Sequence, residues 1–179
     1  MSVIKEQEIN STALRKVAEQ MLIAARTAPK ACGLDNLELA LIERDELSTL
    51  REKMREIGKR ENREFLIRDA GCIENSPVIV IIGTKIQSIG LQDVCGYCGY
   101  KNCNEKDKHP EHPCAYNTHD LGIAIGSAVS VATDNRIDNR VMFSIGKAAI
   151  QLGILGPDVK IVMGIPLSAT GKNPFFDRK

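Results

Sequence analysis

The chain has 179 residues, the length of one ordinary domain, and its 43% hydrophobic and 26% charged residues are typical of a globular protein. Lys and Arg number 24 against 23 Asp and Glu, and the resulting net charge of +1 favours neither nucleic acid nor an anionic membrane as a partner. The sequence has neither an apolar run of membrane-spanning length nor the apolar core of a signal peptide, so we expect a cytoplasmic protein. In a reducing compartment its cysteines are expected to be free for metals or catalysis rather than paired in disulfides.

The first half of the sequence predicts two helices and two strands. Capping residues at 10–12 followed by apolar residues three and four apart indicate a helix that is ended by Pro29. Residues 36–43 alternate leucine with other residues, as a strand does. A charge-rich, amphipathic helix is expected from Asp45 to about Phe65. The β-branched run 78–82 predicts a central strand that is covered on both faces.

The second half predicts a further helix and two further strands. Residues 118–133 indicate a helix of little bulk, because glycine, alanine and serine recur along it; such a helix can pack closely on another helix or on its own symmetry mate. "VMFSIG" (141–146) and "VKIVMG" (159–164) are typical of strands, with a short helix between them. We expect a single α+β domain over residues 1–179, in which an antiparallel or mixed sheet is flanked by helices and an insertion occupies residues 84–117.

Four of the six cysteines lie inside that insertion, with the spacing Cys95-x2-Cys98-x4-Cys103-x10-Cys114. Four thiolates this close can converge on one metal centre. Structural zinc sites are usually built from two short knuckles, whereas a 4Fe–4S cluster spreads its ligands over a larger body. Only the first pair here forms a knuckle. The uneven spacing, together with glycines at 96 and 99 that can turn amide groups toward sulfur, favours a 4Fe–4S cluster, with zinc as the alternative.

The remaining histidines and cysteines leave alternatives open. His109 and His112 either form a solvated turn or join Cys103 and Cys114 in a mixed zinc site. Each histidine, His119 included, also competes with Cys114 for the fourth ligand position. Cys32 and Cys72 are read as small buried side chains or as reactive thiols, and the sequence does not choose between these roles.

Two stretches carry resemblances to known families. "CGYCGYKNC" resembles the cysteine segment of a 4Fe–4S domain found in membrane electron-transport ferredoxin subunits and corrinoid iron–sulfur proteins. "AARTAPKACGLDNLEL", "ENSPVIVIIG" and "GPDVKIVMGIPLSATGKNPFFDR" are similar to the helix, strand and closing tail of the FMN-dependent nitroreductase-like family. As a whole, the chain resembles a little-characterised prokaryotic family described as containing a ferredoxin domain.

The nitroreductase-like resemblance implies a fold, a cofactor and an assembly. It implies an intertwined homodimer with FMN at the interface, and three groups of residues in this sequence match the family's flavin contacts. Beside the ring would lie Ala28, Pro29, Lys30 and Ala31; toward its far side, Ser144, Ile145 and Gly146; and beside the phosphate, Lys172 and Arg178. A phosphate needs cations or helix-terminal amides, and a flavin ring needs close backbone approach, so these residue types suit the group.

Together these patterns favour a redox protein that couples FMN to a 4Fe–4S cluster, possessing no evident catalytic acid or base. Its expected partners are a second copy of the chain and a redox partner protein or small-molecule electron donor. Two alternatives remain: a binding or structural module with a four-cysteine zinc knob, and a flavin-free iron–sulfur carrier or sensor. An FMN-dependent oxidoreductase is the enzyme class that the resemblance suggests, and its substrate is not indicated.

Overall fold

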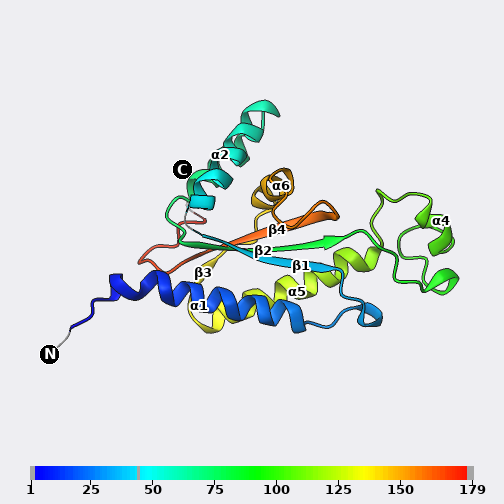
Figure 1. The fold of residues 1–179 in the computed structure, drawn as a ribbon, viewed down its shortest axis with the longest axis horizontal. Coiled ribbons are helices and arrows are strands. Elements are labelled where there is room, and N and C mark those ends of the chain that lie inside the picture. Colours follow the sequence, from blue (N-terminus) through cyan, green and yellow to red (C-terminus); the bar gives the residue numbers. More distant parts are fainter. Residues whose placement is uncertain (1–2, 44, 177–179) are drawn as a thin grey trace.

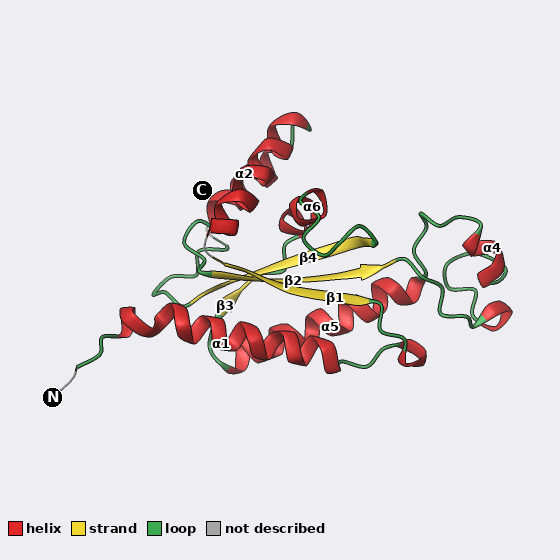
Figure 2. Cartoon of the chain, viewed as in Figure 1, coloured by secondary structure: helices red, strands yellow, loops and turns green. Residues whose placement is uncertain are grey.

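The computed structural model describes residues 3–43 and 45–176. Within them, four antiparallel strands form a sheet in the order β1-β2-β4-β3. Helices lie on both faces of this sheet (Figures 1 and 2). The strands are β1 (Leu37–Glu43), β2 (Val78–Lys85), β3 (Asp138–Asn139) and β4 (Val159–Ser168). The longer helices are α1 (Glu6–Thr27), α2 (Asp45–Arg60), α3 (Glu64–Cys72), α5 (Ala115–Asp134) and α6 (Phe143–Gln151). The predicted α+β class with helices flanking the sheet is confirmed.

Strand β2 separates two apolar cores. Its alternate side chains Val78, Val80 and Ile82 pack with α1 and α5 on one face of the sheet. Ile79 and Ile81 point to the other face, where they pack with α2, α3 and α6. All five of these side chains are buried, as the continuous β-branched run predicts for a central strand. Alternation along one strand therefore divides the molecule into two helical layers.

Helix α6 corrects the sequence prediction for residues 141–146, which were expected to form a strand. Only Met142 makes a strand-like bridge, to Gly164, and the helix begins at the next residue. The helix lies so close to β4 that a Cβ on Gly146 would stand 1.8 Å from the carbonyl oxygen of Val162. Apolar residues at 142, 145, 148 and 149 are buried against the sheet, with helical spacing. The alternation within "VMFSIG" is thus too short to distinguish a strand from the first turn of a buried helix.

Other elements differ from expectation at their ends. Helix α1 begins at Glu6, before the predicted caps. The expected helix over 45–65 ends at Arg60, and a tight turn through Asn62 (φ 52°) leads into α3. Residues 138–139, for which no strand was predicted, pair with the end of β4. Such boundary shifts follow from tertiary packing that local patterns do not record.

The segment between β2 and α5 projects beyond one end of the sheet (green in Figure 1). It holds only a 3-10 turn, η2 (Gln92–Val94), and the five-residue helix α4 (Cys103–Asp107). Another 3-10 turn, η1 (Ala31–Gly33), joins α1 to β1 at the same end of the molecule (Figure 1). Among the helices that the structure describes, none is long and apolar enough to cross a membrane.

Candidate functional site

The four clustered cysteines line one small, mostly enclosed cavity in the projecting segment. Cys95 follows η2, Cys98 lies in the next turn, Cys103 is the first residue of α4, and Cys114 caps the N-terminus of α5. All four carry free thiols, and Cys114 is buried. The cavity is completed by Ser88, Ile89, Leu91, Gln92, Gly96, Tyr100 and Asn102. Folding therefore brings the four predicted metal ligands to one place.

Local backbone conformation wraps the chain around this cavity. Gly96 and Gly99 have φ of 67° and 82°, values that glycine adopts without strain, and the amide of Gly99 closes a tight turn onto the carbonyl of Gly96 at 3.0 Å. Gln92, with φ of 53°, donates its amide hydrogen to Cys103 Sγ at 3.3 Å. An N–H group directed at a ligand sulfur stabilises the negative charge of a thiolate. The amide directed at a sulfur therefore belongs to Gln92, whereas the amide of Gly99, expected to turn toward sulfur, closes its own turn.

Asn117 fixes the position of Cys114. The asparagine is buried, and its Oδ1 accepts the amide hydrogens of Cys114 and Gln87, both at 3.1 Å. Its Nδ2 donates to the carbonyl of Gln87 at 2.9 Å. One side chain therefore ties the start of α5 to the chain leaving β2. Cys114 also stands at the N-terminus of α5, where unpaired backbone N–H groups carry partial positive charge.

The separation of the sulfur atoms distinguishes the two candidate metals. Among the described residues, no three cysteine sulfurs lie within 4.8 Å of one another. Four thiolates on one tetrahedral zinc ion stand about 3.8 Å apart, from Zn–S bonds of about 2.3 Å. Thiolates on the corners of a 4Fe–4S cube stand about 6 Å apart, because each binds a different iron. The four sulfurs line one cavity without the close spacing of a zinc site, so the donor set favours the larger, all-thiolate centre.

The histidines lie outside the cysteine cavity. His109 and His112 stack on each other at 5.3 Å between ring centroids, and both contact the ring of Tyr100. With Glu111 they form an exposed group whose ligand atoms lie within 4.8 Å of one another. Neither lines the cavity of the four sulfurs. Among the described residues, the cavity's lining therefore supplies thiolates and no imidazole.

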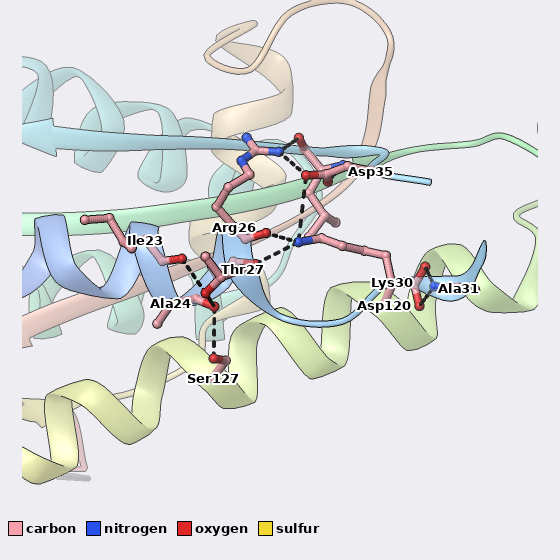
Figure 3. A network of polar contacts seen from close by, with 11 residues as sticks. Ile23, Ala24, Arg26, Thr27, Lys30, Ala31, Asp35, Asp120 and Ser127 are labelled. Carbon is pink, nitrogen blue, oxygen red and sulfur yellow. Dashed lines mark hydrogen bonds and ion pairs between the residues drawn. The ribbon is translucent and has the colours of Figure 1, made fainter. Parts of the chain in front are cut away.

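The turn that the resemblance assigns to the flavin ring lies at the same end of the molecule (Figure 3). Ala28 is buried, whereas Pro29 is exposed. The amide of Ala31 donates to both carboxylate oxygens of Asp120, at 3.2 and 3.1 Å. Asp120 belongs to α5 and is itself buried, so the carboxylate expected as a simple helix cap instead joins η1 to the helix that begins at the cysteine cavity.

Lys30 is used within the turn. Its side chain is 6% exposed, and its ammonium donates to the carbonyls of Ala25 and Arg26 at the end of α1 (Figure 3). It also lies 3.7 Å from Asp35, which accepts a hydrogen bond from Arg26 at 2.7 Å. Burial raises the pKa of Asp35, but the hydrogen bonds from Arg26 and the Leu37 amide, with nearby positive charge, lower it below its ordinary value overall. Hydrogen bonds and ion pairs among Arg26, Lys30 and Asp35 therefore stabilise the turn.

The second group of predicted flavin contacts is in the interior. Ser144, Ile145 and Gly146 are all buried on α6, in the core on the other face of the sheet. Ser144 Oγ donates to the buried carboxylate of Asp69 at 2.6 Å. Asp69 also accepts from Arg68 at 2.8 Å. In one chain this group presents no surface to a flavin and is not brought together with residues 28–31.

The third group lies at the far end of α1. Ala169, near Lys172, accepts a hydrogen bond from Asn10 in the first turns of the helix at 3.1 Å. A polar cleft of about 780 Å³ opens beside it, between the start of α1 and residues 168–171. Arg136 also lines this cleft. Arg178, predicted to contact the phosphate, lies outside the described residues.

Sequence reasoning missed two of the residues that organise the site. Asn117 contacts a residue 30 positions away, and a lone asparagine in a helix sequence gives no sign of such a partner. Tyr116 was also missed. Burial, followed by the nearby Cys95, Tyr97, Cys32 and Cys114, raises the pKa of its phenol. The repeated occurrence of tyrosine beside ligand cysteines was the available signal.

Two sequence comparisons agree with this picture. The sequence profile of a family described as "uncharacterized protein containing a ferredoxin domain (DUF2148)" matches residues 111–178. An uncharacterized protein of Archaeoglobus fulgidus is 39% identical over 184 residues, which cover 98% of this chain and 97% of that protein. The chain belongs to this ferredoxin-domain family. Of the four cavity cysteines, Cys114 alone falls inside the stretch matched by the profile.

Solved structures similar to this member of the ferredoxin-domain family include nitroreductases. A nitroreductase with bound FMN from Bacteroides fragilis superposes with a TM-score of 0.61 at 13% identity, over 99% of this chain and 84% of that one. Nitroreductase CinD from Lactococcus lactis, in complex with nicotinic acid, gives 0.61 at 12% identity, over 96% and 82%. The fold is therefore nitroreductase-like, as the sequence resemblance predicts.

Proposed function

We propose that this chain is a cytoplasmic redox protein that holds a 4Fe–4S cluster in the cavity of Cys95, Cys98, Cys103 and Cys114. The observation that carries the proposal is the donor set: four free thiols line one cavity, and no three of the sulfurs are close enough to share one zinc ion. Membership in a family described as containing a ferredoxin domain supports it. The structural likeness to nitroreductases supports a redox role on the same scaffold.

The chain's own residues perform four tasks at this centre. The cysteine thiolates bind it, and the Gln92 amide and the N-terminus of α5 stabilise their negative charge. Ile89, which is 7% exposed, and Leu91 cover part of the cavity and limit the entry of water. Asn117 keeps Cys114 oriented. When bound, a 4Fe–4S cluster accepts and releases single electrons.

The same proposal includes FMN, held at an interface between two copies of the chain. Helix α1 has 22 residues and is about 33 Å long at a rise of 1.5 Å per residue. The ring-side turn is at one end of it and the tail before Lys172 is at the other. This distance exceeds the length of an FMN molecule, so the two groups of one chain do not reach the same flavin. A second copy, packed in the opposite direction, would bring its tail beside the first copy's turn.

The proposed flavin and cluster sites are neighbours. The Asp120 carboxylate joins the amide of Ala31 to α5, whose first turn carries Cys114. Tyr116 lies on α5 between Cys114 at the cavity and Asp120, which holds the turn. A flavin exchanges electrons one or two at a time, so a one-electron centre beside it is a suitable partner. Substrate and electron donor are left unassigned.

Anaerobic purification followed by a visible spectrum and assays for iron, sulfide, zinc and flavin tests the proposal. We expect about four iron per chain and broad absorbance near about 400 nm, with flavin bands near about 370 and 450 nm when FMN is bound. A colourless chain that holds about one zinc would contradict the redox function. A cluster without flavin would keep the redox centre and reject the FMN part, leaving an iron–sulfur carrier or sensor.

The dimer part is tested separately, by light scattering and by FMN binding. We expect a chain mass doubled in solution and FMN affinity lowered about tenfold in Lys172→Ala, because a cation near a phosphate contributes on the order of 1 kcal/mol. Lys160→Ala is the matched control, since its ammonium lies on the exposed part of β4 and donates to the carbonyl of Pro157. A monomer that binds FMN with unchanged affinity in both variants would reject the shared site.

A further inference from the structure

The tyrosines of this chain are concentrated at one place. The sequence has three, Tyr97, Tyr100 and Tyr116, and no tryptophan. Tyr97 stands between the ligand cysteines at 95 and 98, and Tyr116 follows Cys114 by two residues. Tyr100 faces the cysteine cavity and the histidines. The other two face a different space.

Tyr97, Tyr116 and His119 form an aromatic shelf on the outside of the cysteine cavity. The two tyrosine rings are stacked, with centroids 5.9 Å apart and planes 23° from parallel. His119 meets the Tyr116 ring edge-on, at 6.0 Å and 83°. Tyr97 is 74% exposed. Tyr116 is partly buried, so the open ring of Tyr97 extends outward from a ring that the fold holds in place, and together they indicate a contact surface.

A pocket lies against this shelf. It has a volume of about 570 Å³ and is lined by the three aromatic side chains with Ala115 and Thr118. The size is within the range of small-molecule sites. None of its lining residues belongs to the cavity of the four sulfurs, so the two spaces are separate but share the peptide around Tyr97. Among the described residues His119 makes no hydrogen bond or ion pair, and its ring nitrogens remain available to a ligand.

The shelf also adjoins the turn at residues 28–33. Asp120, the neighbour of His119 in α5, holds the amide of Ala31 (Figure 3). Along α5 the pocket residues Tyr116 and His119 follow Cys114 and precede Asp120, so the pocket adjoins both the cysteine cavity and the turn that Asp120 holds. A flat aromatic ring is the ligand whose faces match stacked tyrosines, while its edge nitrogens and oxygens match an imidazole.

We infer that the pocket at Tyr97, Tyr116 and His119 binds a planar heteroaromatic ring, such as an isoalloxazine or a nicotinamide, stacked on the tyrosines beside the cysteine cavity. The inference rests on the proposed function for the identity of the ring as an electron carrier. The binding surface itself rests on the aromatic geometry alone. Ring stacking on an aromatic side chain tolerates different heterocycles, so both sources share this chemistry.

Equilibrium dialysis of the anaerobically purified chain against riboflavin, FMN and nicotinamide mononucleotide tests the inference. Riboflavin lacks a phosphate and therefore reports on the ring alone. We expect Tyr97→Leu and Tyr116→Leu each to weaken binding of the preferred ring about tenfold, since one stacking contact contributes on the order of 1–3 kcal/mol. Tyr116→Phe keeps the ring and should stay within about threefold of wild type. The compound that binds more tightly, riboflavin or the nicotinamide nucleotide, shows whether the pocket takes an isoalloxazine or a nicotinamide ring.

Phe65→Leu is the matched control, because Phe65 is a 38% exposed ring on α3, on the other face of the sheet. Its ring binding should equal that of wild type, and iron content should be equal in all variants. Failure of every ring to bind the iron-loaded chain would overturn the inference, and so would wild-type affinity in both leucine variants. An iron-free chain that still loses ring binding on Tyr116→Leu would support the shelf while rejecting the cluster, so the two failures are distinguishable.

Discussion

The sheet framework and the cysteine segment, residues 86–114, are stabilised in different ways. Strand β2 is buried along almost its whole length between two apolar cores. Within the cysteine segment Ile89, Lys106 and Cys114 are the buried residues, and its one helix has five residues. Burial of apolar surface is the main source of folding free energy, so the framework is stable by itself. The segment has too small a core for that, so we expect it to depend on the hydrogen bonds at its ends and on the proposed metal centre.

The strongest test of the framework is Gly146→Ala. The added Cβ would stand 1.8 Å from the backbone oxygen of Val162, and backbone atoms of a central strand cannot move aside cheaply. We expect the free energy of unfolding to fall by about 3 kcal/mol or more, measured by urea denaturation.

Gly71→Ala is the matched control, since it lies in α3 and has no neighbouring heavy atom within 4 Å of an added Cβ. This change should be neutral or stabilising by up to about 1 kcal/mol, because alanine favours a helix. Equal destabilisation by the two substitutions would show that close packing of α6 on β4 does not determine the stability of the framework.

The second test concerns the junction between the two regions. Asn117→Ala removes three hydrogen bonds that join Gln87 and Cys114, and leaves the buried Cys114 amide and the partly buried Gln87 amide without their acceptor. We expect a loss of about 2 kcal/mol in unfolding free energy. Amide exchange, measured by mass spectrometry, should accelerate at residues 86–114 and change little in β2.

Asn135→Ala controls for loss of an asparagine elsewhere in the same molecule. Asn135 follows the other end of α5, and its exposed amide donates to the carbonyl of Val131. Its effect should stay within about 0.5 kcal/mol. If exchange in the cysteine segment were as slow in Asn117→Ala as in this control, Asn117 would not anchor the segment.

A smaller effect is expected at Asp35, in the connection between α1 and β1. Folding lowers the pKa of Asp35 below its ordinary value of 3.8, so the carboxylate contributes stability above that pH and loses it as pH falls through the lower folded pKa. Asp35→Asn should therefore cost about 0.5 kcal/mol near pH 7, and the difference from wild type should shrink below about pH 3. Thermal unfolding at both pH values, repeated in high salt, measures it. A difference that persists unchanged in acid would show that charge is not its cause.

The two regions also differ in how well the sequence predicts them. The β-branched run at 78–82 predicts a buried central strand, and the cysteine spacing predicts one shared cavity. Both signals lie within a short stretch of sequence. The strand prediction for residues 141–146 was wrong, because close packing against β4, which the local pattern does not record, accompanies a helix there. Asn117 and Asp120 could not be predicted, because each acts through a partner far along the chain, 30 and 89 residues away.

The central claim is that the cysteine segment is built around a 4Fe–4S centre. Low-temperature electron paramagnetic resonance of the dithionite-reduced, anaerobically purified chain tests it most directly. We predict the signal of a reduced 4Fe–4S cluster at about one spin per chain, lost or strongly altered in Cys98→Ser while the far-ultraviolet circular dichroism of the framework is retained. An anaerobic wild-type chain that is silent in this experiment and carries about one zinc would contradict the account.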